Sequence, residues 1–406
     1  MRHFVSSLIP ASRSAPCGRQ IIGNRVRKRG ARIQHDWRYN SCLGPNNRAT
    51  IGEIKMKTKW QALASVAALL MLLIACSPQE AEAPVVEEAA APEGPSAEAI
   101  IAEALSAASP SFSDTATVAD WQGNVHREGT GSYTCLPSPP GMTPGSSPMC
   151  MDEPFMAWAN AWGTKGDLAI DSIGISYMLA GDGGASNIDP FAAGKTEDND
   201  WVKEGPHLMI ISPDAASLDS LPTDFNNGGP YVMWKGTPYA HVMVPVDLGD
   251  AHTMQGGALG DALSAGNADM VINAKVADWD GNVLQEGDGP YTCLPTPPIF
   301  ADGRAPMCMD QQWMAWAKAW ANKEDVNIDS IGISYMLAGD EGGSNTDPFG
   351  TEPTEDNEWV VSGAHLMIIV PDSSLLAGLP TDPNNGGPYV MWRDTSYAHV
   401  MVPVGD

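Results

Sequence analysis

The chain has 406 residues with 49 acidic and 23 basic side chains, so its formal net charge is −26 at neutral pH. The first 60 residues hold 13 of the basic side chains and two of the acidic ones, which leaves a net charge near −37 from Cys76 onward. Such a field repels nucleic acid and anionic lipid head groups, which argues against nucleic acid as a partner. The same charge attracts cations and favours solubility in salt, and both interpretations remain open.

Residues 56–75 have the pattern of an export signal. A short basic start is followed by the apolar stretch Leu63–Ala75, and at roughly 13 residues this core is too short to span a bilayer comfortably. The segment ends in Leu73-Ile74-Ala75-Cys76, which resembles the lipobox of bacterial lipoproteins. The resemblance implies lipidation of Cys76 and anchoring in the envelope of a Gram-negative bacterium, and Ser77 in the next position favours its outer membrane.

Two segments flank this signal. Residues 1–55 precede a complete signal peptide and show no regular hydrophobic period, so we expect a non-native upstream extension or a disordered segment. Residues 76–97 consist largely of Glu, Ala and Pro and contain almost no large apolar side chain. Such a segment cannot bury enough surface to offset its ordering entropy, so we expect an acidic tether.

The remainder of the chain is an internal repeat at an offset of 158 residues. Val118-Ala-Asp-Trp121 recurs as Val276-Ala-Asp-Trp279, and about two thirds of the aligned positions are identical. Units of this length are domain-sized and too long for solenoid repeats. We expect repeat domain 1 at 98–248, a linker at 249–256 and repeat domain 2 at 257–406.

The first repeat shows both helical and strand patterns. We expect a helix over 97–108, a hairpin over 116–128 turning at Gln122-Gly123-Asn124, a helix capped by Asp152 and running to about Trp162, and strands at 173–179, 207–211, 231–234 and 239–246. Helices and strands do not alternate regularly. The pattern therefore predicts an α+β fold with two tandem homologous domains, each a mainly antiparallel sheet packed with one or two helices.

Each repeat contains two cysteines 15 residues apart, Cys135 and Cys150 in the first and Cys293 and Cys308 in the second. An exported protein meets an oxidising compartment, where paired cysteines usually form a disulfide, so we expect one disulfide per repeat. A closed loop of this size contributes roughly 3 kcal/mol in the chain-entropy description. The alternative is metal ligation by thiolates together with the adjacent methionines.

Two other features suggest ligands. The predicted helix carries Phe155, Trp158 and Trp162, a stripe that serves either as a sugar-stacking platform or as a face packed on a sheet. The loops Asp182–Asp189 and Glu197–Asp200 offer oxygen ligands for Ca²⁺ but lack the twelve-residue calcium-loop spacing, so they also fit solvated acidic loops. Common linear catalytic motifs are missing, which leaves a hydrolase site assembled only in three dimensions as an alternative.

Two predicted strands of each repeat carry a histidine and a methionine two positions apart. Side chains two positions apart on a strand point to the same face, and imidazole with thioether suits Cu(I). The candidate metal ligands are His207, Met209, His241, Met243, His365, Met367, His399 and Met401. The alternative is a methionine-rich core face in which each imidazole bonds a backbone carbonyl.

Four motifs of the first repeat resemble a family of uncharacterised bacterial exported proteins. They are Thr134-Cys-Leu-Pro137, Pro148-Met-Cys-Met-Asp152, Gly174-Ile-Ser-Tyr-Met-Leu179 and Pro206-His-Leu-Met209. The resemblance covers most of each repeat, implies export, and supplies no activity.

These observations predict a lipid-anchored, acidic cell-envelope protein with two tandem binding domains for a cation or small ligand and no assigned reaction. Its membrane contact is the N-terminal lipid. The alternatives are a periplasmic Cu(I)-binding protein, a hydrolase and a structural surface protein; Ca²⁺ is the second candidate ion.

Overall fold

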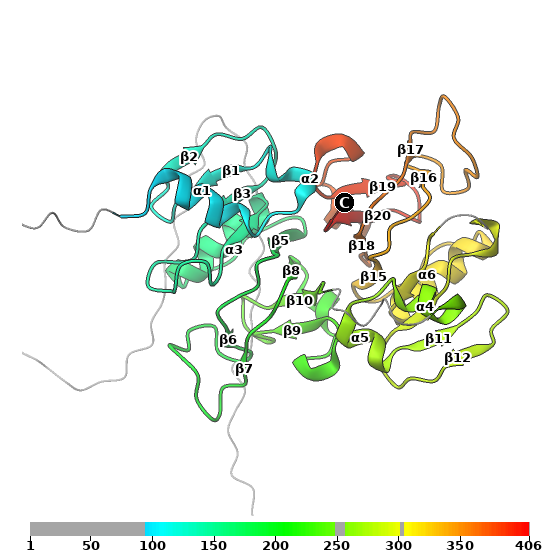
Figure 1. Ribbon diagram of the computed structural model, residues 1–406, viewed down its shortest axis with the longest axis horizontal. Helices are drawn as coiled ribbons and strands as arrows, with labels where there is room; N and C mark the ends of the chain where they lie inside the picture. The colour runs from blue at the N-terminus through cyan, green and yellow to red at the C-terminus, as the bar shows by residue number, and fades with distance from the viewer. Residues whose placement is uncertain (1–93, 248–255, 301–303, 406) are drawn as a thin grey trace, which may run out of the picture. The chain divides into compact units, whose positions relative to one another are not determined.

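The computed structural model describes residues 94–247, 256–300 and 304–405 (Figure 1). The predicted signal peptide, Cys76, most of the tether and nearly all of the linker at 249–256 lie outside these ranges. Within them, no helix combines the length and apolar character needed to cross a membrane.

Repeat one forms an eight-stranded sheet in the order β2-β1-β3-β4-β5-β8-β10-β9. All of its neighbouring strands are antiparallel except β1 and β3. The elements are α1 (Ala97–Leu105), α2 (Pro110–Ser113), β1 (Thr117–Ala119), β2 (Val125–Arg127), β3 (Thr134–Leu136), β4 (Met149–Met151), α3 (Glu153–Thr164), β5 (Gly174–Met178), β6 (Ala185–Ser186), β7 (Trp201–Val202), β8 (His207–Ile211), η1 (Ala215–Leu218), η2 (Phe225–Asn227), β9 (Tyr231–Met233) and β10 (His241–Pro245).

Repeat two has the same topology, with the sheet order β12-β11-β13-β14-β15-β18-β20-β19. Its elements are α4 (Gly257–Leu263), α5 (Ala268–Asn273), β11 (Lys275–Ala277), β12 (Val283–Gln285), β13 (Thr292–Leu294), η4 (Pro298–Phe300), β14 (Met307–Met309), α6 (Gln311–Asn322), β15 (Gly332–Met336), β16 (Gly343–Ser344), β17 (Trp359–Val360), β18 (His365–Ile369), η5 (Ser373–Leu376), η6 (Pro383–Asn385), β19 (Tyr389–Met391) and β20 (His399–Pro403). Two similar, mostly antiparallel sheets with few helices confirm the predicted α+β fold.

Local sequence explains how α3 begins. The Asp152 side chain accepts a hydrogen bond from the Phe155 N–H at 2.9 Å, which caps the helix as predicted, and Pro154 lies in the first turn. The second carboxylate oxygen accepts the Ile175 N–H of β5 at 2.7 Å. One buried side chain therefore fixes the helix against the sheet, and Asp310 repeats both contacts in repeat two.

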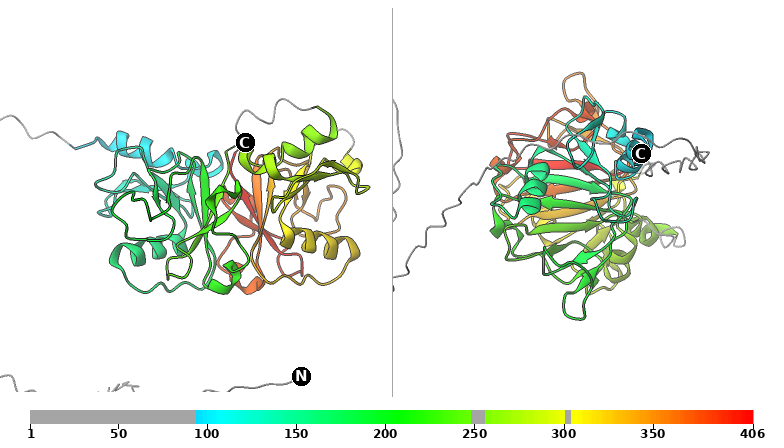
Figure 2. Two further views of the ribbon diagram at one scale, coloured as in Figure 1. Left: turned by 90° about the horizontal axis from the view of Figure 1, so that it is seen from below. Right: turned by 90° about the vertical axis from the view of Figure 1, so that its left-hand side faces the viewer.

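Each sheet has two covered faces. In β5, Ile175 and Tyr177 enter a central core that contains buried residues of both repeats, whereas Met178 enters an outer core beneath α3. The corresponding outer core of repeat two lies beneath α6. The two sheets, drawn in green and in orange to red, lie between these helices (Figure 2). The described repeats therefore belong to one compact unit with a common core.

The contacts between the repeats are reciprocal. The Ile173 N–H donates to the Leu375 carbonyl at 3.1 Å, and the equivalent Ile331 N–H donates to the Ser217 carbonyl at 2.9 Å. The same surface is used on both sides, as in a two-fold symmetric dimer. Gly228 has a φ of 76°, and a Cβ there would lie 2.8 Å from the Asp269 backbone, so this turn requires glycine.

Both predicted disulfides are present. Cys135 bonds Cys150, and Cys293 bonds Cys308. In each repeat the two half-cystines lie directly opposite one another on neighbouring antiparallel strands. Paired cysteines of this kind are typical of a secreted or otherwise extracytoplasmic protein.

Candidate functional site

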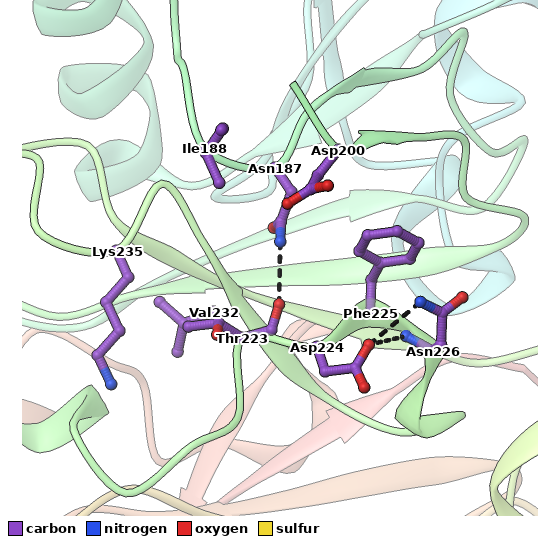
Figure 3. A pocket seen from close by; sticks show the side chains of 9 residues that line it. All are labelled: Asn187, Ile188, Asp200, Thr223, Asp224, Phe225, Asn226, Val232 and Lys235. Atoms are coloured by element: carbon purple, nitrogen blue, oxygen red, sulfur yellow. Dashed lines mark hydrogen bonds between the residues drawn. The ribbon is translucent and has the colours of Figure 1, made fainter. Parts of the chain in front are cut away.

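A pocket of 440 Å³ lies in repeat one beside the end of β9 (Figure 3). This volume falls within the usual range for small-molecule sites. Its lining combines two carboxylates, two amides, one amine and several apolar side chains. The residues are Asn187, Ile188, Asp200, Thr223, Asp224, Phe225, Asn226, Val232 and Lys235.

The short hairpin β6–β7 brings the two acidic loops of the sequence together. Asn187 follows β6, Asp200 precedes β7, and the Asn187 N–H donates to the Asp200 carbonyl at 2.9 Å. The Asn187 carbonyl in turn accepts the Trp234 N–H at 2.8 Å. Asp200 and Trp234 adopt left-handed backbone conformations, with φ of 44° and 56°. Such conformations in residues other than glycine persist only where their surroundings enforce them.

Asn187 is the most constrained polar side chain of the pocket. Only 6% of its surface is exposed, and its Nδ2 donates to the Thr223 carbonyl at 2.9 Å. Its Oδ1 is buried and has no hydrogen-bond partner within the described part of the chain. An acceptor left in this state costs about 1–3 kcal/mol unless a donor or a cation reaches it.

The remaining lining sets the chemical character of the pocket. Asp224 accepts the Asn226 N–H at 2.9 Å and thereby caps η2. Lys235 donates from Nζ to the Asp219 carbonyl at 3.0 Å, which holds the amine at the rim. Phe225 and Val232 add apolar surface. Carboxylate and amide oxygens beside apolar walls complement a ligand with a protonated amine and an apolar body.

The region of repeat two that is equivalent to this pocket has different side chains. Thr346, Glu358, Pro383 and Arg393 occupy the positions of Ile188, Asp200, Phe225 and Lys235. Glu358 accepts the Asn345 Nδ2 at 3.0 Å, and Arg393 donates to the Leu376 carbonyl at 3.3 Å. The Oδ1 of Asn345 is also buried without a partner among the described residues. The buried asparagine is thus present in both repeats, but four of the other side chains around it differ.

The histidines of β10 and β20 are enclosed by tryptophans. The His241 ring lies 5.2 Å from the Trp158 ring and 4.9 Å from the Trp234 ring, and its Nδ1 is 3.0 Å from the Tyr239 carbonyl. Burial lowers the pKa of His241 to about 4, against the opposing effect of that hydrogen bond. His399 has an equivalent environment and a pKa of about 4 for the same reason. Both imidazoles are therefore neutral core groups at neutral pH.

The strand register separates the side chains that the sequence grouped as copper ligands. Met209 lies opposite Met243, and His207 lies opposite Pro245, four residues along β10 from His241. Four strand residues extend about 13 Å, so the two imidazoles do not meet at one ion. Met367 and His365 have the same relation to Met401 and His399. Cu(I) binding stays a prediction that this arrangement does not favour.

The tryptophan stripe of α3 packs inward. Trp158 is 4% exposed and stacks on Trp234 at 5.8 Å, and Trp162 donates from Nε1 to the Pro190 carbonyl at 2.9 Å. No histidine lines the pocket of repeat one. Among the described residues, no group of three His, Cys, Asp or Glu side chains is placed to hold a metal ion.

Sequence reasoning missed most of the pocket. It identified the loops that contain Asn187 and Asp200, but not Thr223, Phe225 or Lys235. Thr223 and Phe225 come from one turn and Lys235 from another, and neither turn carries a motif. Ile188 and Phe225 are apolar residues in otherwise polar loops. They could have indicated the pocket from the sequence, because apolar side chains in loops often line binding sites.

Comparison with protein-family models, with curated proteins and with solved structures finds no match to this chain. The resemblance to bacterial exported proteins therefore stays a prediction. Any functional conclusion has to be drawn from the geometry of the described residues.

Proposed function

We propose that this chain is a lipid-anchored protein of the bacterial cell envelope that binds a small organic cation in the pocket of its first repeat. The disulfides support folding outside the cytoplasm. The lipobox-like segment supports attachment through Cys76, and the acidic tether would hold the repeats away from the membrane. The proposal assigns no reaction.

The anchor has a direct test. Expressed from Met56 in a Gram-negative host, the chain should be cleaved before Cys76 and carry lipid, as read by mass spectrometry of the membrane fraction. Cys76→Ser should leave it unprocessed or release it from membranes. Unchanged lipid anchoring of that variant would refute this part of the proposal.

The observation that carries the binding proposal is the buried Asn187 Oδ1 in a pocket that also contains the Asp200 carboxylate. An ammonium group supplies several hydrogen-bond donors and a positive charge, so its chemistry matches both an amide oxygen and a carboxylate. The apolar side chains of Phe225 and Val232 offer contact area for the rest of the ligand. The acidic character of the whole protein raises the local concentration of cations.

Cyclohexylamine and cyclohexanol form a matched pair of probes, because they share an apolar ring and differ in the charged group. Ligand-observed NMR on the full chain should detect binding of the amine and much weaker binding of the alcohol. Asp200→Asn should weaken amine binding about tenfold, since a hydrogen bond to a charged group contributes about 1.5–3 kcal/mol. The control is Glu358→Gln, which changes the equivalent residue of repeat two.

The proposal fails if the amine and the alcohol bind equally, or if Asp200→Asn binds the amine as tightly as the wild type. A parallel titration with Ca²⁺ examines the alternative that the two acidic loops bind a hard cation. Displacement of the amine by Ca²⁺ at equimolar concentration would favour that alternative.

A further inference from the structure

One wall of the pocket in repeat one contacts repeat two. This wall turn, residues 223–229, contains η2 and ends in the left-handed Gly228, whose φ is 76°. A Cβ on Gly228 would lie 2.8 Å from the Asp269 carbonyl of α5, so the turn packs directly against repeat two. Figure 1 shows α5 beside β9 and β10. Four pocket residues belong to the wall turn: Thr223, Asp224, Phe225 and Asn226.

Asn267, the residue before α5, is bonded to the wall turn. Its side chain is 1% exposed, and its Nδ2 donates to the Gly228 carbonyl at 3.0 Å and to the Pro245 carbonyl at 3.2 Å. Its Oδ1 accepts the Asp269 N–H at 2.8 Å and thereby caps α5. One buried carboxamide of repeat two therefore holds its own helix and the backbone of repeat one together.

The wall turn is also stabilised by hydrogen bonds of its own. Asp224 accepts the Asn226 N–H at 2.9 Å, and the Asn227 Oδ1 accepts the Gly229 N–H at 2.7 Å. These bonds join residues that are two positions apart. They give the turn its local shape, but they do not attach it to the rest of the pocket.

Attachment comes from two asparagines at opposite ends of the wall turn. At its start, the Asn187 Nδ2 donates to the Thr223 carbonyl at 2.9 Å. At its end, the Asn267 Nδ2 donates to the Gly228 carbonyl. Asn187 is the residue whose buried Oδ1 carries the binding proposal. A contact from repeat two thus lies one short turn away from the polar centre of the pocket.

We infer that repeat two controls ligand binding in the pocket of repeat one, and that Asn267 is the positioning residue through which this control acts. The inference rests on the proposed function, because it concerns the same pocket. The apparent affinity of a pocket falls with the fraction of molecules in which its walls are in place. A bond from repeat two that holds the wall turn raises this fraction. By linkage, a ligand that binds the ordered wall strengthens the contact between the repeats.

The equivalent position of repeat one supplies a matched comparison. Ser109 stands there and also caps a helix, because it accepts the Ser111 N–H of α2 at 3.4 Å. Its hydroxyl pairs with the Ser111 hydroxyl at 2.9 Å, within its own repeat. The facing turn of repeat two still packs closely, since a Cβ on Gly386 would lie 2.7 Å from the Ser111 carbonyl. Serine thus supplies the cap, and asparagine adds the reach to the facing turn.

The first measurement uses the protein without ligand. Asn267→Ser keeps a capping side chain and removes the bonds to Gly228 and Pro245. Hydrogen–deuterium exchange, followed by mass spectrometry, should then become faster in residues 223–229, because one end of the wall turn is released. The control is Ser109→Ala, which weakens the equivalent helix start of repeat one and should leave exchange in residues 223–229 unchanged. Near-UV circular dichroism confirms that both variants are folded.

The second measurement uses cyclohexylamine as the probe. In ligand-observed NMR, Asn267→Ser should weaken amine binding about fivefold, which corresponds to about 1 kcal/mol for one lost hydrogen bond. Ser109→Ala should bind the amine as the wild type does. The amine should also slow hydrogen exchange in α5 of the wild type but not in α5 of Asn267→Ser. A merely structural loss would lower stability without changing the affinity of the folded protein for the amine.

Unchanged amine affinity in Asn267→Ser would overturn the inference, as would an equal loss of affinity in Ser109→Ala. These results differ from a failure of the proposed function, in which the wild type itself does not bind the amine and the inference falls with it. If Asn267→Ser does not fold, Asn267→Thr decides, since threonine also caps a helix and fills more of the vacated volume.

Discussion

The two repeats share a structural framework but carry different side chains at several equivalent loop positions. Both have the disulfide between neighbouring strands, the buried histidine between tryptophans and the capping aspartate. They diverge where Glu204 in repeat one corresponds to Ser362, and where Lys235 corresponds to Arg393. A duplicated fold thus keeps a common frame while its loops acquire separate chemistry.

The difference at Glu204 shows how one substitution changes a polar site. In repeat one the Glu204 carboxylate bonds the Tyr231 hydroxyl, and burial raises the pKa of Glu204. In repeat two the shorter Ser362 leaves the buried Tyr389 hydroxyl without such a carboxylate partner among the described residues. The buried tyrosine hydroxyl is therefore bonded to a carboxylate in repeat one and not in repeat two, although equivalent strands carry the two tyrosines.

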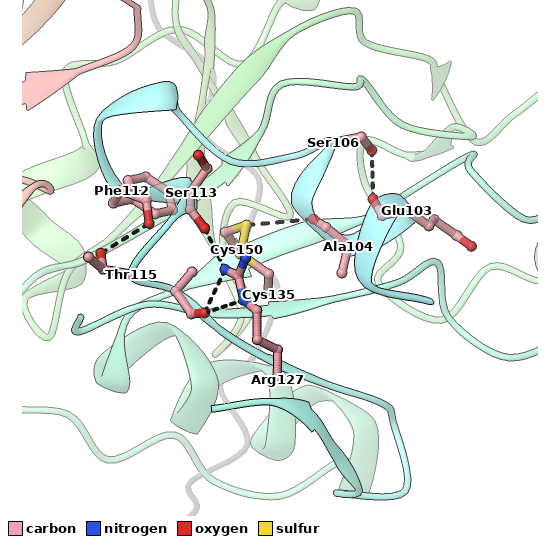
Figure 4. Close-up of a disulfide and its surroundings, with 10 residues drawn as sticks. Glu103, Ala104, Ser106, Phe112, Ser113, Thr115, Arg127, Cys135 and Cys150 are labelled. Carbon is pink, nitrogen blue, oxygen red and sulfur yellow. Dashed lines mark hydrogen bonds between the residues drawn. A yellow bond between two sulfur atoms is a disulfide. The ribbon is translucent and has the colours of Figure 1, made fainter. Parts of the chain in front are cut away.

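The largest expected difference in stability comes from removing the disulfide of one repeat or of the other. Figure 4 shows the Cys135–Cys150 bond beside Ala104 of α1. Replacing both cysteines by alanine should lower the free energy of unfolding by about 3 kcal/mol, the chain-entropy value for a loop of about 15 residues. The Cys293–Cys308 pair encloses a loop of the same length and should give the same loss. Guanidinium unfolding of each double variant measures both values.

The number of unfolding transitions provides a check on this prediction. Because both disulfides lie in the central core, either change should shift one common unfolding transition of the repeats. Two separate transitions, only one of them displaced by each double variant, would show that the repeats unfold independently and would contradict the common core.

The fold could be predicted from the sequence wherever local chemistry determines it. Asp152 followed by Pro154 marks a helix start, and the alternation from Ile173 to Leu179 marks a strand with one apolar face. The export signal together with the paired cysteines Cys135 and Cys150 predicts their bond. The alternation does not reveal that both faces of β5 are buried. The packing of the two repeats around one core could therefore not be predicted from it.

The sites were less accessible to sequence reasoning, because they depend on register and on turns. His207 and His241 share a face by alternation, but the register of β8 with β10 sets them four residues apart. The partner of His365 is Asp340, which lies 25 positions earlier in a loop. No spacing rule links two such residues, and only the short hairpin β16–β17 connects their loops.

The smallest expected effect concerns the protonation of the two enclosed histidines. His241 and His399 have pKa values of about 4 in the folded protein, against 6.5 for an ordinary imidazole. Below pH 6.5 the unfolded chain therefore takes up protons that the folded protein refuses, and stability is lost as the pH falls toward 4. Each imidazole should account for about 2 kcal/mol of destabilisation between pH 7 and pH 5. Unfolding of His241→Gln and of His399→Gln at several pH values measures this loss.

The wild-type curve alone does not isolate this effect, because two buried carboxyl groups act in the opposite direction. Burial raises the pKa of Asp152 to about 7 and that of Asp310 to about 6, so the folded protein binds protons there before the unfolded chain does. The difference between the wild type and each glutamine variant removes this contribution. We expect that difference to shrink on acidification by the same amount for both repeats, since the two histidines have equivalent surroundings. A difference that stays constant with pH in either repeat would mean that its histidine has the same pKa in the folded protein as in the unfolded chain.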